Sequence, residues 1–206
     1  MQRAFSSLIV LVHGIDSPLL IKDTLSNLRV ALLQQASLRD VFVLQSKVNQ
    51  GRTKDGIEKM ATRLVWEIED ACREHNLLKT GVQISFVGHS LGGIISRYAI
   101  FLLHEKKLLG ERFVPVSYVA VASPHLGVRR AETWLGRFQS VAGEFLYGGS
   151  QTLDELMLRD HPENPLLVRM ASNEFLNPLS KFRLTLVSAI AFDHQVGVSF
   201  VFHFIL

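Results

Sequence analysis

A short motif, Val87 to Gly93 (VGHSLGG), sets one serine among glycines directly after an apolar run. Residues 82–87 have the length and apolar content of a buried strand, and Leu91 to Leu103 have those of a helix. Only small residues permit the close backbone approach that a tight strand-to-helix turn requires. The motif therefore predicts a strand–turn–helix unit, and it favours folds in which strands and helices alternate.

The same alternation continues along the rest of the chain. The further predicted strands are Leu8–Val12, Val41–Leu44, Val116–Ala122 and Arg183–Ala191, and the further predicted helices are Asp23–Ala36 and residues 55–75. Apolar residues in the helix of residues 55–75 recur at spacings of three and four: Ile57, Met60, Ala61, Leu64, Val65, Ile68, Ala71 and Cys72. This pattern predicts an α/β fold with a mostly parallel sheet and helices on both faces.

The length of 206 residues and the hydrophobic content of 48% predict a single domain that spans residues 1–206. About 60 residues, 123–182, separate the fourth and fifth predicted strands. A compact α/β domain seldom needs so long a crossover, so this segment is predicted to be an inserted lid or cap.

Composition and charge exclude several classes of function. The net charge is only +3 and the charged residues are mixed, which gives no basic stripe for nucleic acid but is compatible with weak peripheral contact with a membrane. No apolar run is long enough for a transmembrane segment, and the first one is too short for a signal peptide. Cys72 is the single cysteine, so we expect a reducing compartment and a cytoplasmic protein.

Neither a metal nor a nucleotide cofactor is predicted. No pair of histidines has zinc-ligand spacing with a cysteine or carboxylate partner. The glycine motif lacks both the G-x-G-x-x-G pattern of dinucleotide-binding loops and the lysine of phosphate-binding loops. These absences disfavour a redox enzyme that depends on such a cofactor.

Ser90 is the candidate nucleophile, because Gly88, Ser90 and Gly92 match the G-x-S-x-G pattern of a nucleophile elbow. Such a turn strains the serine backbone and exposes its hydroxyl, and the free N–H groups of the following helix favour negative charge there. The alternative is a glycine-rich turn in which Ser90 only caps the helix.

The first predicted strand is followed by His13 and Gly14, which places a second loop near the serine. Stabilisation of an oxyanion needs two backbone N–H groups, one from the residue after the nucleophile and one from the loop after an earlier strand. Leu91 and Ile15 are the predicted donors, and Gly14 lets the peptide turn inward. His13 is expected to be a structural histidine rather than a base.

The chain resembles the α/β-hydrolase superfamily, and within it the DUF676 group of serine esterases and lipase-like proteins. The matching stretches run from residue 10 to residue 197 and are VLVHGI, FVGHSLGGIISRYAI, VAVASPHLGVR, TLDELMLRDHPENPLLVRMA and SAIAFDHQVG. The resemblance implies hydrolysis of lipid or acyl esters without a metal or organic cofactor. In the superfamily, a serine, an acid and a histidine follow one another in the chain.

Asp193 is the favoured acid, because it directly follows the fifth predicted strand in a loop similar to the acid-bearing loop of the family; Asp154 and Asp160 are competitors within the insertion. His203 is the candidate base, and it would end a strand over Val198–Phe202. The alternative is that His203 is a chance residue in an apolar tail. His194 is adjacent to the acid and fits poorly.

From Val198 onward the chain departs from the family pattern, so we expect a truncated chain that lacks the C-terminal strand and helix of the family, and with them the base of the triad. His125, in SPHLG, precedes the acid and is interpreted as structural. Apolar residues of the insertion are interpreted either as ordinary packing or as a wall for an acyl chain: Trp134, Leu135, Phe138, Phe145, Leu146 and Tyr147.

Overall fold

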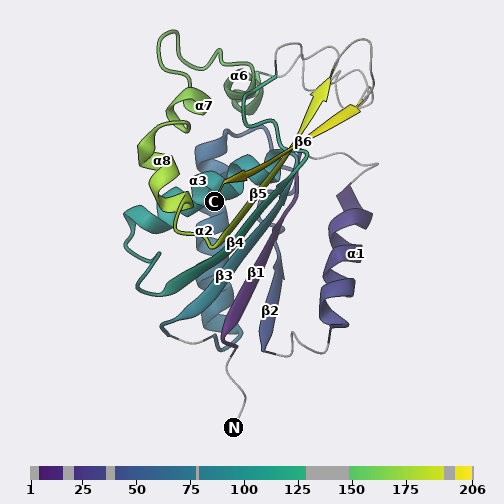
Figure 1. Cartoon of the computed structure of the whole chain (residues 1–206), viewed down its shortest axis with the longest axis vertical. Coiled ribbons are helices and arrows are strands. Elements are labelled where there is room, and N and C mark those ends of the chain that lie inside the picture. Colours follow the sequence, from purple (N-terminus) through teal and green to yellow (C-terminus); the bar gives the residue numbers. More distant parts are fainter. Residues whose placement is uncertain are drawn as a thin grey trace.

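The computed structural model describes residues 5–15, 21–35, 40–77, 79–128, 149–192 and 198–205. Strands and helices alternate through the first 121 residues, as predicted (Figure 1). The elements are β1 (Ser7–Val12), α1 (Ile21–Leu33), β2 (Val41–Gln45), α2 (Ile57–Glu74), β3 (Val82–His89), α3 (Leu91–Glu105), β4 (Phe113–Val121), α6 (Gln151–Leu156), α7 (Leu166–Arg169), α8 (Asn173–Leu179), β5 (Leu184–Phe192) and β6 (Val198–Ile205).

The strands form one sheet in the order β2-β1-β3-β4-β5-β6. The first five are parallel and β6 runs antiparallel to β5 at the edge, which confirms the predicted mostly parallel sheet. β1 and β3 are neighbours, and Val12 is paired with Gly88. The carboxyl ends of these two strands therefore finish side by side, which is where open α/β sheets place their binding sites.

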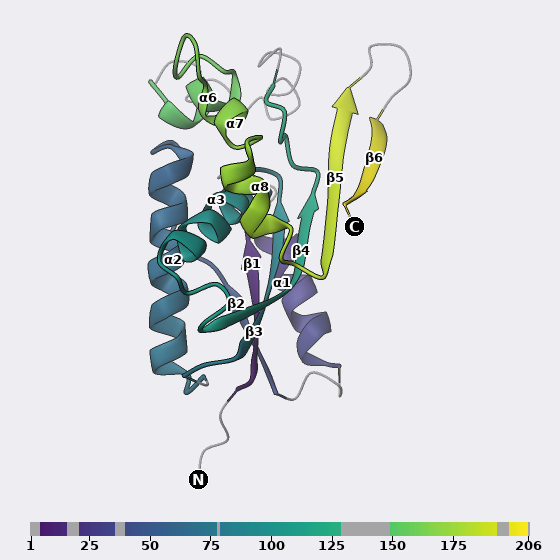
Figure 2. The same cartoon turned by 60° about the vertical axis from the view of Figure 1, so that its left-hand side comes forward.

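Helices cover both faces of the sheet, as predicted. Helix α1 packs on β1 and β2 from one side, whereas α2, α3 and α8 pack together on the other (Figure 2). The α2/α3 face carries the larger core, because α3 is apolar along almost its whole length and buries twelve of its fifteen residues. The described part of the chain contains no helix with the length and apolarity needed to cross a membrane.

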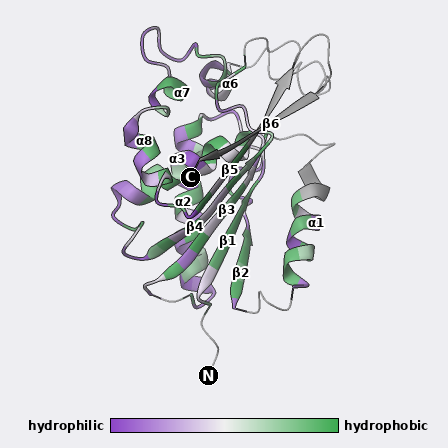
Figure 3. Cartoon of the chain, in the orientation of Figure 1, coloured by the Kyte–Doolittle hydropathy of each residue, from purple (hydrophilic) through white to green (hydrophobic). Residues whose placement is uncertain are grey.

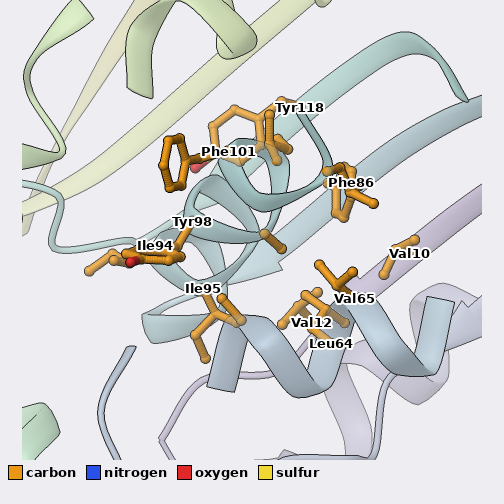
Figure 4. Packing of buried hydrophobic residues seen from close by; sticks show 14 of the residues in the cluster. Val10, Val12, Leu64, Val65, Phe86, Ile94, Ile95, Tyr98, Phe101 and Tyr118 are labelled. Carbon is orange, nitrogen blue, oxygen red and sulfur yellow. The ribbon is translucent and has the colours of Figure 1, made fainter. Parts of the chain in front are cut away.

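The apolar stripe predicted for residues 55–75 is the buried side of α2. All eight of its predicted members are buried in the structure. Leu64 and Val65 of this helix pack near Val10 and Val12 of β1, next to the side chains of α3 (Figure 4). Hydrophobic residues likewise run along the central strands (Figure 3). Burial of each large side chain contributes about 1.5–3 kcal/mol, so this layer fixes α2 and α3 against the sheet.

Several element boundaries differ from the predicted ones. β4 starts three residues before the predicted Val116 and ends at Val121 rather than Ala122, because Ala122 has a φ of 53°, which no extended strand can continue. Helix α1 begins at Ile21 and ends at Leu33, and β6 extends to Ile205.

The described part of the insertion, residues 149–182, is tied to the N-terminus of α2. The N–H of Gly56 donates to Thr152 Oγ1 at 3.0 Å, and the N–H of Ile57 donates to Glu155 Oε2 at 2.7 Å. These bonds satisfy two of the donors that the first turn of a helix leaves free. The residues next to the N-terminus of α2 in the sequence provide no side-chain cap. Helix α6, which lies far away in the sequence, provides it instead.

Glu155 is buried, and burial raises the pKa of its carboxyl group to about 7. The hydrogen bonds from Ile57 and Gln151 lower this pKa, and the nearby acids Asp160 and Glu58 raise it, but the cost of burying the charge is the largest effect. Near neutral pH the cap carries a proton in a large fraction of molecules.

A raised pKa in the folded state makes the contribution of Glu155 to stability greatest below pH 4.5, and this contribution is lost as the pH rises towards 7. The variant Glu155→Gln keeps an acceptor for Ile57 but does not titrate. We therefore expect the free energy of unfolding of the wild type to fall relative to Glu155→Gln between pH 4.5 and 7, by on the order of 1 to 3 kcal/mol. Urea unfolding at several pH values measures the difference, and a constant difference across this range would contradict the expectation.

Candidate active site

Ser90 stands alone at the bend between β3 and α3. Its φ of 55° and ψ of −125° lie outside the regions that L-residues ordinarily adopt. The bend is held by the N–H of Ser90, which donates to Val121 O at 2.8 Å, and by the N–H of Gly93, which donates to Ser90 O at 3.1 Å. The serine side chain makes no capping hydrogen bond to the helix. This geometry disfavours the alternative of a simple helix cap.

Glycines make this bend possible because other backbone segments occupy the space that a side chain would need. A Cβ atom at Gly88 would overlap Gly92 and Gly93, and one at Gly92 would overlap the carbonyl oxygens of Val12 and His13. Gly93, to which the sequence reasoning gave no role, would collide with Ser123 and Ala120. The third glycine of VGHSLGG is the sequence signal that could have indicated this close packing.

The loop after β1 lies directly against the serine. A Cβ atom at Gly14 would lie 2.8 Å from Ser90 Cβ and 3.2 Å from Ser90 Oγ. Ile15 follows in the same loop and is partly buried against the core, and Leu91 is the first residue of α3, whose N–H has no partner within the helix. The structure thus brings both segments that were predicted to supply oxyanion donors to the same hydroxyl.

The two histidines nearest the elbow are partly or fully buried. His13 is 4% exposed, and its Nδ1 lies 2.8 Å from Gly14 O. Burial lowers the pKa of His89, the residue before the serine. The contact of His13 with its own neighbour suits a structural histidine, as the sequence suggested.

A buried network connects the first turn of α3 with the SPHLG loop after β4. The hydroxyl of Tyr118 donates to Gly93 O at 2.9 Å and lies 3.3 Å from His125 Nε2. Because a tyrosine has one hydroxyl hydrogen, this arrangement makes the N–H of Nε2 the donor to the tyrosine oxygen. Burial, and secondarily the charge of Arg97, lower the pKa of His125 to about 3. His125 is therefore a weak base held in a structural position.

Arg97 ties the same helix to the insertion. It is 9% exposed, and its Nη2 donates to the carbonyl oxygen of Met170. Within the described residues this guanidinium has no ion-pair partner. The sequence assigned no role to Arg97, although it lies within the stretch FVGHSLGGIISRYAI, or to Tyr118, because the hydrogen-bond partners of both lie far away in the chain.

The other predicted catalytic residues and their competitors lie on later segments of the chain. Asp193 lies outside the described residues, as does His194. The competitor Asp160 accepts from the N–H of Leu166 at 2.8 Å, which is a local cap, and Asp154 lies in the first turn of α6. The aromatic and apolar cluster predicted for residues 134–147 also lies outside the described residues.

His203 lies within β6, where its backbone pairs with Val187 of β5. Val187 is level with Ala120 of β4, and Ala120 with Gly88 of β3. In the order of the sheet, β4 and β5 lie between β6 and β3. The role of His203 as the base stays a prediction.

The part of the chain that the structure describes contains no group of three or more His, Cys, Asp or Glu side chains that could hold a metal ion. Cys72 is buried in the core, and burial raises the pKa of its thiol.

Comparison with known proteins points to the chemistry of serine esterases. The model of the family described as "Putative serine esterase (DUF676)" matches residues 3–199. Two Saccharomyces cerevisiae relatives are "Putative lipase YDL109C", 25% identical over 86% of this chain and 27% of the relative, and "Putative lipase ROG1", 29% identical over 59% of this chain and 17% of the relative. This chain thus spans less than a third of the length of these relatives.

Among solved structures, the RedJ thioesterase from the prodiginine biosynthetic pathway of Streptomyces coelicolor is similar to this chain with a TM-score of 0.41. The sequence identity is 17%, and the match covers 79% of this chain and 65% of the thioesterase.

Substitutions at Ser90 test whether the backbone at the bend is strained. Glycine adopts a positive φ without the steric cost that any Cβ imposes, so we expect Ser90→Gly to be more stable than Ser90→Ala by about 1 kcal/mol. Urea unfolding of the two variants measures this difference. An alanine variant as stable as the glycine variant would show that the bend is not strained.

The hydroxyl of Tyr118 provides a second test. The variant Tyr118→Phe leaves Gly93 O and His125 without their shared partner in a buried place, so we expect a loss of about 1 to 3 kcal/mol in the free energy of unfolding. Chemical denaturation measures it. An unchanged unfolding midpoint would mean that the network does not hold the start of α3.

Proposed function

The chain belongs to the DUF676 serine esterase family, and we propose that it is a serine hydrolase that cleaves lipid or acyl carboxylic esters through an acyl-serine intermediate. The observation that carries this proposal is the strained Ser90 with the Gly14 loop packed against its hydroxyl. Both features have a structural cost, and such costs are characteristic of functional sites.

In the proposed reaction Ser90 Oγ attacks the ester carbonyl carbon while a general base takes its proton. The backbone N–H groups of Ile15 and Leu91 donate to the oxyanion of the tetrahedral intermediate, which collapses as the alcohol leaves with the proton from the base. Water then attacks the acyl-serine by the same route and releases the carboxylic acid. Asp193 orients the base and His203 is the base in the triad that the sequence predicts.

The substrate class follows from the family and from relatives named as lipases. Peripheral contact with a membrane surface and a location in the cytoplasm are further parts of this proposal, suggested by composition.

We expect a fluorophosphonate probe to label Ser90 covalently, because such probes react with activated serine hydroxyls. The variant Ser90→Ala should lose labelling and ester hydrolysis, whereas Ser172→Ala, which removes an exposed hydroxyl at the start of α8, should keep both. Mass spectrometry of the labelled protein identifies the site. A folded wild type, checked by circular dichroism, that remains unlabelled would refute the proposed nucleophile.

A second candidate is a catalytically impaired hydrolase domain that binds a lipid or a partner, and the departure of the chain from the family pattern after Val198 favours it. The loss of a triad base reduces the rate by about 10⁴- to 10⁶-fold. The variant His203→Ala separates the two candidates. A loss of this size in ester hydrolysis identifies His203 as the base, unchanged hydrolysis places the base elsewhere, and a wild type with only background hydrolysis favours the binding domain.

A further inference from the structure

Three exposed apolar side chains follow the path of the backbone from the residue bonded to Ser90 towards α6. The first is Val121, at the end of β4, whose backbone carbonyl oxygen accepts the hydrogen bond from the N–H of Ser90. The path continues through the SPHLG loop to Leu126 and from there to Leu158, just after α6. The exposed fractions of the three side chains are 40%, 92% and 39%. We refer to Val121, Leu126 and Leu158 as the apolar ledge.

The contacts of the loop place Leu126 near the elbow. Two tight turns fold the loop, because the N–H of His125 donates to Ser123 O and the N–H of Gly127 donates to Pro124 O, each at 3.0 Å. His125 shares the Tyr118 hydroxyl with Gly93 O, in the first turn of the helix that follows Ser90. The partly buried histidine thus fixes the loop against that turn, while the next side chain, Leu126, is 92% exposed.

Leu158 is joined to this loop by the backbone. The N–H of Val128 donates to Leu156 O at 2.7 Å, and a Cβ atom at Gly127 would lie 3.5 Å from Leu158 Cγ. The loop after β4 and helix α6 lie at the same end of the molecule in both views (Figures 1 and 2). The ledge therefore joins the sheet to the insertion beside the candidate nucleophile.

Backbone strain is concentrated along the same path. Five non-glycine residues in the described structure have a positive φ, and three of them are Ser90, Ala122 and Leu158. Leu158 occupies the left-handed position after α6, where glycine is the usual residue. A large apolar side chain is thus kept exposed at a position that disfavours it, and strained positions of this kind cluster at sites that bind ligands.

We propose that the apolar ledge receives the acyl chain of the ester substrate and sets the preference for its length. This inference rests on the proposed function, since the ledge acts on the same site. An acyl chain bound at Ser90 needs an apolar surface that begins at the nucleophile and leads away from it. The ledge lies along the loop that is bonded to the bend at Ser90 and at the helix end beside that loop, and a bound chain would cover side chains that are costly to leave in water.

The test compares two fluorophosphonate probes that differ only in their alkyl group, one short and one long. The alkyl group stands in for the acyl chain, and the rate of Ser90 labelling is the readout. We expect the wild type to react faster with the long-chain probe. Leu126→Ser and Leu158→Asn should each reduce the ratio of long-chain to short-chain rates by about 5- to 30-fold. Asparagine is chosen at residue 158 because it tolerates a positive φ.

The matched control is Leu33→Ser, which removes an equally apolar side chain, 52% exposed, at the end of α1. This variant should keep the wild-type ratio. If Ser90 reacts with both probes and the ledge variants keep the wild-type ratio, the ledge proposal is overturned while the proposed function stands. If neither probe labels Ser90 in folded wild type, the proposed function fails and the ledge proposal fails with it.

Discussion

The close approach of Gly14 to Ser90 is the contact on which the rest of the site depends. Val12 and Gly88 are register partners on adjacent strands, so the chain two residues further on in each strand meets at the same height. A side chain on Gly14 would press on the serine, and one on Gly92 would overlap the end of β1. The sheet register and the glycines Gly14, Gly88 and Gly92 together allow the hydroxyl of Ser90 to lie between the loop after β1 and the start of α3.

Around this contact, hydrogen bonds of buried polar side chains hold distant elements together. Tyr118 holds the first turn of α3, Arg97 holds the segment near Met170, and Glu155 holds the first turn of α2. Each group is removed from water and so depends on its hydrogen-bond partner, which makes the arrangement specific. The described part of the insertion is thereby fixed to helices α2 and α3.

The sequence predicted what local periodicity and local turn chemistry determine. The buried side of α2 follows from spacing alone, and the strand–turn–helix bend at Ser90 follows from glycines at the end of an apolar run. It did not predict Tyr118, Arg97 or Glu155, because their partners lie 25 to 98 residues away in the chain. Local sequence patterns could not predict the backbone position of His203 either, because it depends on the direction in which β6 pairs with β5.

The cap of α2 has a consequence for the order in which the molecule forms. The two hydrogen bonds join Gly56 to Thr152 and Ile57 to Glu155, across 96 and 98 residues. During synthesis on the ribosome, α2 and most of the sheet emerge well before α6. The N–H groups of the first turn of α2 therefore lack these hydrogen-bond partners until α6 has been synthesised. Completion of the domain is therefore a late event of synthesis, and the nascent chain is most vulnerable to proteases and misassembly in that interval.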